Sequence, residues 1–262
     1  MPMRLLFALC VAALSAFAQA DAGQAWRDAY QCALRQHEML TDYHLHASDP
    51  KDRQQLASLQ RSRQSAADCS RSVAESLSAL GLARFGSDIS NHQRQIARTL
   101  SYNLETIARK GVPENAVVAE MVQHELDMVA SLNGAANELA ASGAAKPAAE
   151  AKQARDLALL MEYANLRYIE RTTQLYPRDD SAESTIDELA TSFGKGLATL
   201  RAAKKLNDAQ RKKLDSVLTK YRFINGSLVN YNDKTVPFTV NRHAHSIVAL
   251  LGELADELDS VK

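Results

Sequence analysis

The chain has 262 residues, of which 46% are hydrophobic and 24% are charged. With only 10 glycines and 6 prolines, the composition excludes a disordered or collagen-like chain. The 31 Lys and Arg balance the 31 Asp and Glu, which argues against a nucleic-acid-binding protein, because such proteins use excess lysine and arginine to neutralise phosphates. The sequence therefore predicts a globular protein with a buried core.

Residues 1–20 have the pattern of a secretory signal peptide. Arg4 precedes an apolar run that begins at Leu5, and Ala18-Gln19-Ala20 provides the small residues of a cleavage site, so we expect the mature chain to begin at Asp21. The run is shorter than the ~20 residues that cross a bilayer, and we expect no stable membrane insertion after cleavage. The predicted location is periplasmic or secreted.

Five of the six prolines separate segments whose apolar residues recur with a helical period. The β-branched and aromatic enrichment of strands is missing from these segments. Polar residues that precede some of the segments predict N-caps at Ser48-Asp49, Asp180-Ser181 and Asn207-Asp208. We expect eight helices, over residues 22–46, 51–80, 88–110, 114–141, 148–176, 182–203, 208–232 and 238–260.

The short connections between these helices favour antiparallel neighbours. Eight helices of this length suit two four-helix bundles better than one globule, and the alanine-rich segment 140–147 is the expected joint. We therefore predict an all-α fold of two tandem antiparallel four-helix bundles after a cleaved signal peptide. The expected units are the signal peptide 1–20, an N-terminal bundle 21–145 and a C-terminal bundle 146–262.

The two halves share a pattern that is consistent with one duplicated unit. Leu34-Arg35 and Leu166-Arg167 lie at similar depths in the first helix of each half. Aligning Val118 with Val240 puts further apolar residues opposite one another, namely Val122, Val129, Leu132 and Leu139 opposite Ala244, Leu251, Leu254 and Val261. In this register Glu125 stands where the second half has Ile247.

Cys32 and Cys69 lie at equal distances from the turn predicted near residues 48–51. Residues equidistant from the turn of an antiparallel hairpin lie at the same level, so we predict a disulfide between the first two helices. Paired cysteines are also expected in an oxidising compartment. Closing a loop of this length should stabilise the fold by roughly 3–4 kcal/mol. We expect a structural role, because the sequence has no C-x-x-C redox motif.

Common catalytic signatures are missing from the sequence, among them the nucleophile elbow, the phosphate-binding loop, the dinucleotide fingerprint and the zinc-protease helix. The C-x-x-C-H attachment site of c-type haem is missing too. We therefore expect a protein that is not an enzyme and has no cofactor.

Polar residues on the apolar stripes of the second half suggest a pocket for a small anion. Two guanidinium groups with tyrosine and asparagine donors could bind a carboxylate if these helices lie across the core from one another. The alternative interpretation pairs the arginines with Glu162 and Glu170 at the surface. The candidate ligand-binding residues are Arg167, Tyr168, Arg171, Tyr221 and Asn225.

One face of the segment 114–141 carries a possible metal site made of Met121, His124 and Met128. Thioether and imidazole groups suit copper or an iron porphyrin, and His37 could add a further ligand. In the alternative interpretation the methionines fill gaps in the core and His124 lies at its edge in water.

The leading functional hypothesis is a non-enzymatic binding or interaction module of the bacterial-type cell envelope. Its expected partner is an unidentified envelope protein or a small anionic ligand, and no nucleic acid. The second hypothesis is a periplasmic metal- or haem-handling protein that uses the Met and His residues. The third is a purely structural role through oligomerisation along exposed helix faces.

Overall fold

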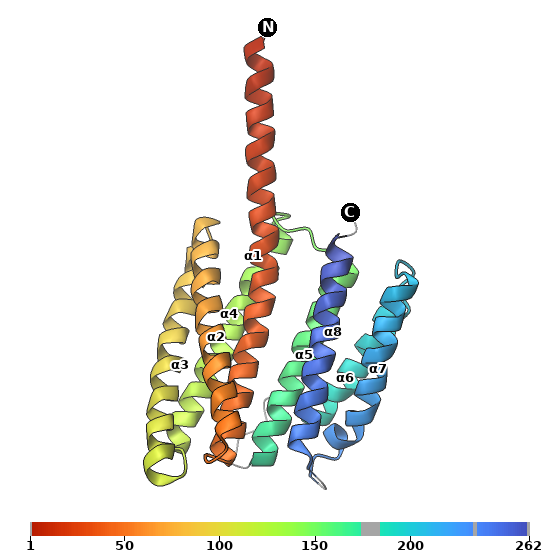
Figure 1. Ribbon diagram of the computed structural model, residues 1–262. Coiled ribbons are helices and arrows are strands. Elements are labelled where there is room, and N and C mark those ends of the chain that lie inside the picture. Colours follow the sequence, from red (N-terminus) through yellow and green to blue (C-terminus); the bar gives the residue numbers. More distant parts are fainter. Residues whose placement is uncertain (1, 174–183, 233–234, 261–262) are drawn as a thin grey trace.

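A computed structural model of the chain describes residues 2–173, 184–232 and 235–260, with side chains from Asp21 onward (Figure 1). These residues form helices and no strand, which confirms the predicted all-α fold. Among them, no helix has both the length and the apolar character needed to cross a membrane. The helices are α1 (Pro2–Ser48), α2 (Arg53–Ala79), α3 (Ala83–Lys110), α4 (Asn115–Ala141), α5 (Ala149–Thr173), α6 (Ile186–Arg201), α7 (Asp208–Val229) and α8 (Pro237–Ser260).

The largest difference from the predicted boundaries is in α1, which begins at Pro2 and continues without a break to Ser48. Its first part projects beyond the other helices (Figure 1). The cleaved signal peptide stays a prediction. The predicted helix residues 174–176 and 182–183, and the predicted cap at Asp180-Ser181, lie outside the described residues.

The starts of α2 and α7 show how local hydrogen bonds set helix boundaries. Asn207 caps α7 as predicted: its side chain accepts a hydrogen bond from the Gln210 amide at 2.9 Å, and the Gln210 side chain accepts one from the Asn207 amide at 3.0 Å. The predicted cap of α2 at Ser48-Asp49 is wrong. The Asp52 side chain caps α2 instead, accepting a hydrogen bond from the Gln54 amide, because a turn separates Asp49 from the helix.

The eight helices pack as two sets of four that meet along one seam (Figure 1). In the first set, α1 packs on α2 and α4, and α3 packs on α2 and α4. In the second, α5 packs on α6 and α8, and α7 packs on α6 and α8. The seam is the contact between α1 and α5. Whether each set is an independent bundle stays a prediction.

Each set has its own apolar core. One leucine from each set crosses the seam and is buried in the core of the other set. Leu45 extends from α1 and is buried in the core of the second set, at 2% exposure. Leu166 extends from α5 and is buried in the core of the first set. Each leucine therefore removes apolar surface from water only when the two sets are in contact, which stabilises the seam.

The predicted disulfide is present between Cys32 of α1 and Cys69 of α2, whose Cα atoms are 5.5 Å apart. The two residues meet because α1 and α2 are antiparallel and joined by a short turn, which puts residues equidistant from the turn side by side. The bridge ties together two helices of the first set.

Candidate functional site

Ionisable side chains are buried along the α1–α5 seam. Buried charges are costly unless they are paired, so their partners indicate how the seam is held together. Both helices contribute, and α4 and α8 add residues from either side. The buried ionisable residues of the seam are His37, Asp42 and His44 of α1, Glu125 of α4, and Glu162, Arg167 and Glu170 of α5.

His37 and Glu125 form the closest of these pairs, with Nδ1 and Oε1 2.6 Å apart. His37 is 2% exposed and Glu125 is fully buried. Burial lowers the pKa of His37, but the charge and hydrogen bond of Glu125, together with the charges of Glu162 and Glu170, raise it more. The net pKa of His37 is above its ordinary value of 6.5, which favours the protonated ring beside Glu125.

Glu170 lies between His44 and Arg167 further along the seam. Its Oε1 is 3.5 Å from Nε2 of His44, and its Oε2 is 3.5 Å from Nε of Arg167. Arg167 also donates a hydrogen bond to the hydroxyl of Tyr163 at 3.3 Å. The contact between His44 and Glu170 connects α1 to α5.

His245 of α8 approaches the seam from the opposite side, with its Nε2 3.5 Å from Oε1 of Glu162. Burial lowers the pKa of His245, but Glu162, Glu38 and Asp42 raise it to about 9. Burial in turn raises the pKa values of Glu38 and Asp42. A protonated His245 therefore offsets the repulsion among three carboxylates that come from α1 and α5.

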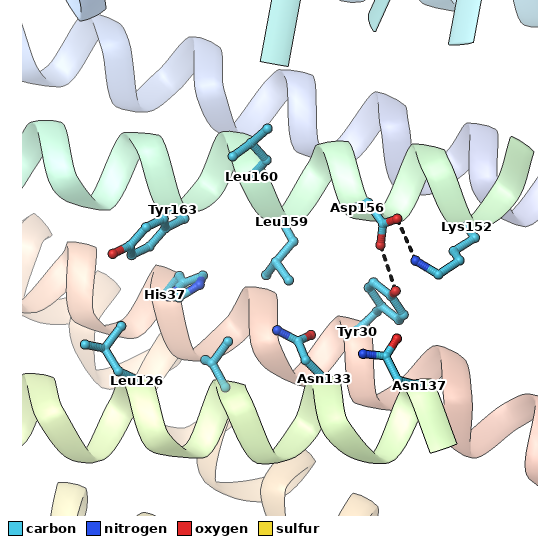
Figure 2. Close-up of a pocket in the computed structure, with 11 residues that line it drawn as sticks. Tyr30, His37, Leu126, Asn133, Asn137, Lys152, Asp156, Leu159, Leu160 and Tyr163 are labelled. Carbon is cyan, nitrogen blue, oxygen red and sulfur yellow. Dashed lines mark hydrogen bonds and ion pairs between the residues drawn. The ribbon is translucent and has the colours of Figure 1, made fainter. Parts of the chain in front are cut away.

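A groove of about 430 Å³ lies where α4 and α5 flank α1 (Figure 2). Both helices pack on α1 and make little contact with each other, which leaves room between them. We call this the α1–α4–α5 groove. Its middle is apolar and it contains polar groups at both ends. Its lining residues are Tyr30, His37, Leu126, Val129, Asn133, Asn137, Lys152, Asp156, Leu159, Leu160 and Tyr163.

The two ends of the groove differ in chemistry, as Figure 2 shows. At one end, Asp156 accepts hydrogen bonds from the Tyr30 hydroxyl and the Lys152 ammonium, each at 2.7 Å. Burial and the bond to Asp156 raise the pKa of Tyr30, so its hydroxyl stays protonated. At the other end lie His37 and Tyr163, with ring centroids 5.3 Å apart. Among the described residues, none hydrogen-bonds the Nε2 atom of His37.

The five residues predicted to bind an anion lie in different surroundings. Among the described residues, no contact joins Arg167 or Arg171 to Tyr221 or Asn225. Arg167 is buried against Glu170, whereas Arg171 is exposed and donates to Asn232. The remaining three are Tyr168, whose hydroxyl accepts from the Val236 amide, Tyr221, which donates to the Ala190 carbonyl, and Asn225, which is half-buried. An anion pocket made of these five residues stays a prediction.

The predicted metal ligands also lie in different surroundings. Met121 and Met128 are fully buried in the apolar core of the first set. His124 is half-buried at the boundary of α3 and α4, where its Nδ1 lies 3.3 Å from Nδ1 of His92. His37, the possible additional ligand, is engaged with Glu125.

The sequence contains a signal for part of the seam. His37 and His44 lie on the apolar face of α1, and Glu125 replaces an apolar residue of the repeat. Glu170 does pair with Arg167, as the alternative interpretation has it, but at a buried seam instead of the surface. His245 had no such signal, because nothing in its own helix indicates which carboxylates it meets.

Comparison of the chain with protein-family models, with curated proteins and with solved structures finds no match.

Proposed function

We propose that this protein is a non-enzymatic binding module that takes a small amphipathic ligand into the α1–α4–α5 groove. The observation that carries the proposal is the lining of this groove, which combines an apolar middle with hydrogen-bonding groups at both ends. Its volume of about 430 Å³ falls in the range of small-molecule sites, which is about 300–1,000 Å³.

The lining supports a ligand with an apolar body and a hydrogen-bond acceptor. Leu126, Val129 and Leu159 offer an apolar surface to the body of such a ligand. His37 offers its Nε2 atom, because its Nδ1 lies 2.6 Å from Glu125. Glu125 also raises the pKa of His37, which favours the doubly protonated ring whose Nε2–H donates. A carbonyl or carboxylate group is the matching acceptor.

The seam supports a role for the groove beyond simple capture. The floor of the groove is α1 of the first set and one wall is α5 of the second, so a ligand would contact both sets at once. A ligand that binds only when the sets are in contact stabilises that arrangement by mass action.

The proposed setting is the periplasm or the extracellular space, reached through a cleaved signal peptide at residues 1–20. The Cys32–Cys69 disulfide is compatible with an oxidising compartment. We further propose that the two helix sets are tandem four-helix bundles, and that an envelope protein receives or supplies the ligand.

A groove-filling variant tests the proposal. Anilinonaphthalene sulfonate, which has an apolar body and an anionic acceptor, is the probe, and its fluorescence is titrated against the protein. Leu159→Trp places a large side chain in the middle of the groove, so we expect it to weaken probe binding at least tenfold. The matched control is Leu104→Trp, since Leu104 is also partly buried against the first core but does not line the groove.

Equal binding by the two tryptophan variants would contradict the groove as the site. Far-UV circular dichroism checks that both variants keep their helices. Native mass spectrometry of the protein purified gently from its own cells then looks for the natural ligand. A mass that disappears on denaturation and is missing from Leu159→Trp would identify it.

A further inference from the structure

A second cluster of polar side chains lies between α3 and α4 and is separate from the α1–α4–α5 groove. His92 extends from α3, and His124 and Asp127 extend from α4. One nitrogen or oxygen atom from each residue lies within 4.8 Å of the others, and all three residues are half-buried. Elsewhere in the described part of the chain, no three His, Cys, Asp or Glu side chains come together in this way.

The spacing of the two imidazoles matches that of ligands to one metal ion. The Nδ1 atoms of His92 and His124 are 3.3 Å apart. A tetrahedral zinc ion holds nitrogen ligands at about 2.0–2.1 Å, which puts two of them about 3.3 Å from each other. The two nitrogens, which share a hydrogen bond in the structure without an ion, therefore already have the separation that one ion requires.

The surroundings of these ligands provide a second line of support. Histidines that bind a metal through one nitrogen commonly donate the other N–H to a carboxylate. The Nε2 atom of His124 lies 3.9 Å from Oε1 of Glu120, which is too long for a hydrogen bond but places a carboxylate on the side of the ring away from His92. Gln123 donates a hydrogen bond to Oδ1 of Asp127 at 2.9 Å, which orients this carboxylate and leaves Oδ2 for an ion.

Buried apolar residues of α3 and α4 fix the positions of the two histidines relative to each other. On α3, Ile89 and Ile96 are buried on either side of His92 along the chain. On α4, Met121 and Met128 flank His124 in the same way and are fully buried. Because these apolar contacts hold α3 against α4, the two histidines face each other as a consequence of core packing. Binding an ion would then need little ordering of the chain.

We propose that His92, His124 and Asp127 bind one divalent first-row transition-metal ion. Two imidazoles and one carboxylate suit zinc, copper or nickel, whereas calcium and magnesium favour sites made of oxygen ligands. Zn²⁺ is the ion chosen for the test. Three protein ligands leave a fourth position for water or for a group from a partner.

Isothermal titration of the purified, disulfide-bonded protein with Zn²⁺ tests the site. We expect one ion per chain. His92→Gln and His124→Gln should each weaken binding at least tenfold. The matched control is His243→Gln, which removes another half-buried histidine from the second set and should leave binding unchanged.

Two results would overturn the site. The first is no Zn²⁺ binding by the unmodified protein, and the second is equal binding by the His92→Gln/His124→Gln double variant. The unmodified protein loaded with Co²⁺ gives a check that needs no variant, because a tetrahedral site with nitrogen ligands produces visible absorption bands. The absence of these bands at full Co²⁺ occupancy would contradict the proposed coordination. None of these measurements depends on the ligand of the groove.

Discussion

The two helix sets have different chemistry at positions that the predicted repeat makes equivalent. The repeat register places Glu125 opposite Ile247, and the offset between Leu34 and Leu166 places His37 opposite Ile169. All four side chains are almost completely buried. The first set therefore contains a buried ion pair where the second set contains two isoleucines.

This difference between the two sets points to the His37–Glu125 pair, and to the groove beside it, as the functional region. A buried ion pair contributes little net stability compared with well-packed apolar residues, because desolvation of the charges offsets their attraction. If the predicted repeat register holds, the isoleucines indicate that the four-helix arrangement does not require the pair at this position. The pair lies at the end of the α1–α4–α5 groove that also holds Tyr163, and its histidine lines the groove.

The largest effect is expected from removing one member of the pair. Glu125→Ile leaves His37 without its nearest counter-charge in a buried site, so we expect the free energy of unfolding to fall by about 3–5 kcal/mol. The double variant His37→Ile/Glu125→Ile copies the chemistry of the second set and should recover most of this loss. Guanidinium unfolding measures both variants.

A conservative change in the second set is the control for this pair. Ile247→Val removes one methylene from the equivalent position and should cost about 0.5–1.5 kcal/mol. If Glu125→Ile and the double variant lose the same stability, the two residues are not coupled and the comparison of the sets does not hold.

The disulfide gives the second-largest effect, and it belongs to the first set alone. Cys32→Ala/Cys69→Ala should lower the free energy of unfolding by about 3–4 kcal/mol on the chain-entropy model. Trp26 is the single tryptophan and is buried in the first core, so its fluorescence follows the first set, while far-UV circular dichroism follows both.

These two signals also test how strongly the sets are coupled. Separate fluorescence and dichroism transitions in the cysteine variant are expected if the sets unfold as distinct units. Coincident transitions that both move to lower denaturant would show that the seam makes the eight helices one cooperative unit.

The smallest effect is a pH dependence of stability at the seam. His245 has a pKa of about 9 in the folded protein, above the value of about 6.5 in an unfolded chain. Its contribution is therefore complete below pH 6.5 and is lost as the pH rises to about 9. Because the His245 side chain is 34% exposed, we expect solvent screening to limit this loss to about 1 kcal/mol.

Urea midpoints between pH 6 and pH 9 measure the effect. His245→Gln should flatten the profile, although a part of the slope should remain because the pKa of His37 is raised as well. His243→Gln is the control, since burial lowers the pKa of His243 and its removal should not reduce the slope. An unchanged slope in His245→Gln would contradict the role of His245.

Much of the fold could be predicted because helices are local. The period of apolar residues and the position of the prolines depend on neighbours in the chain, and they predicted the α-helices closely except at the starts of α1, α3 and α6. The disulfide could be predicted for a related reason, since a short turn fixes which residues of a hairpin are level.

The candidate sites could be predicted only in part. The sequence drew attention to Glu125 as a polar residue in place of an apolar one, and to His37 and His124 as possible metal ligands. It did not indicate that His37 would meet Glu125, or that His124 would meet His92 and Asp127 in place of the methionines. A stripe shows which face of a helix is buried, but not which neighbour covers it.

The sequence by itself determined the helical class, the bounds of most helices and the level at which Cys32 meets Cys69, because each depends on contacts between residues close along the chain or joined by one turn. Only the tertiary structure decided that α1 packs on α5, and with it the buried charges of the seam and the groove beside them. The physical reason is that this contact joins residues more than a hundred positions apart, and helical periodicity carries no information about which of several similar faces they share.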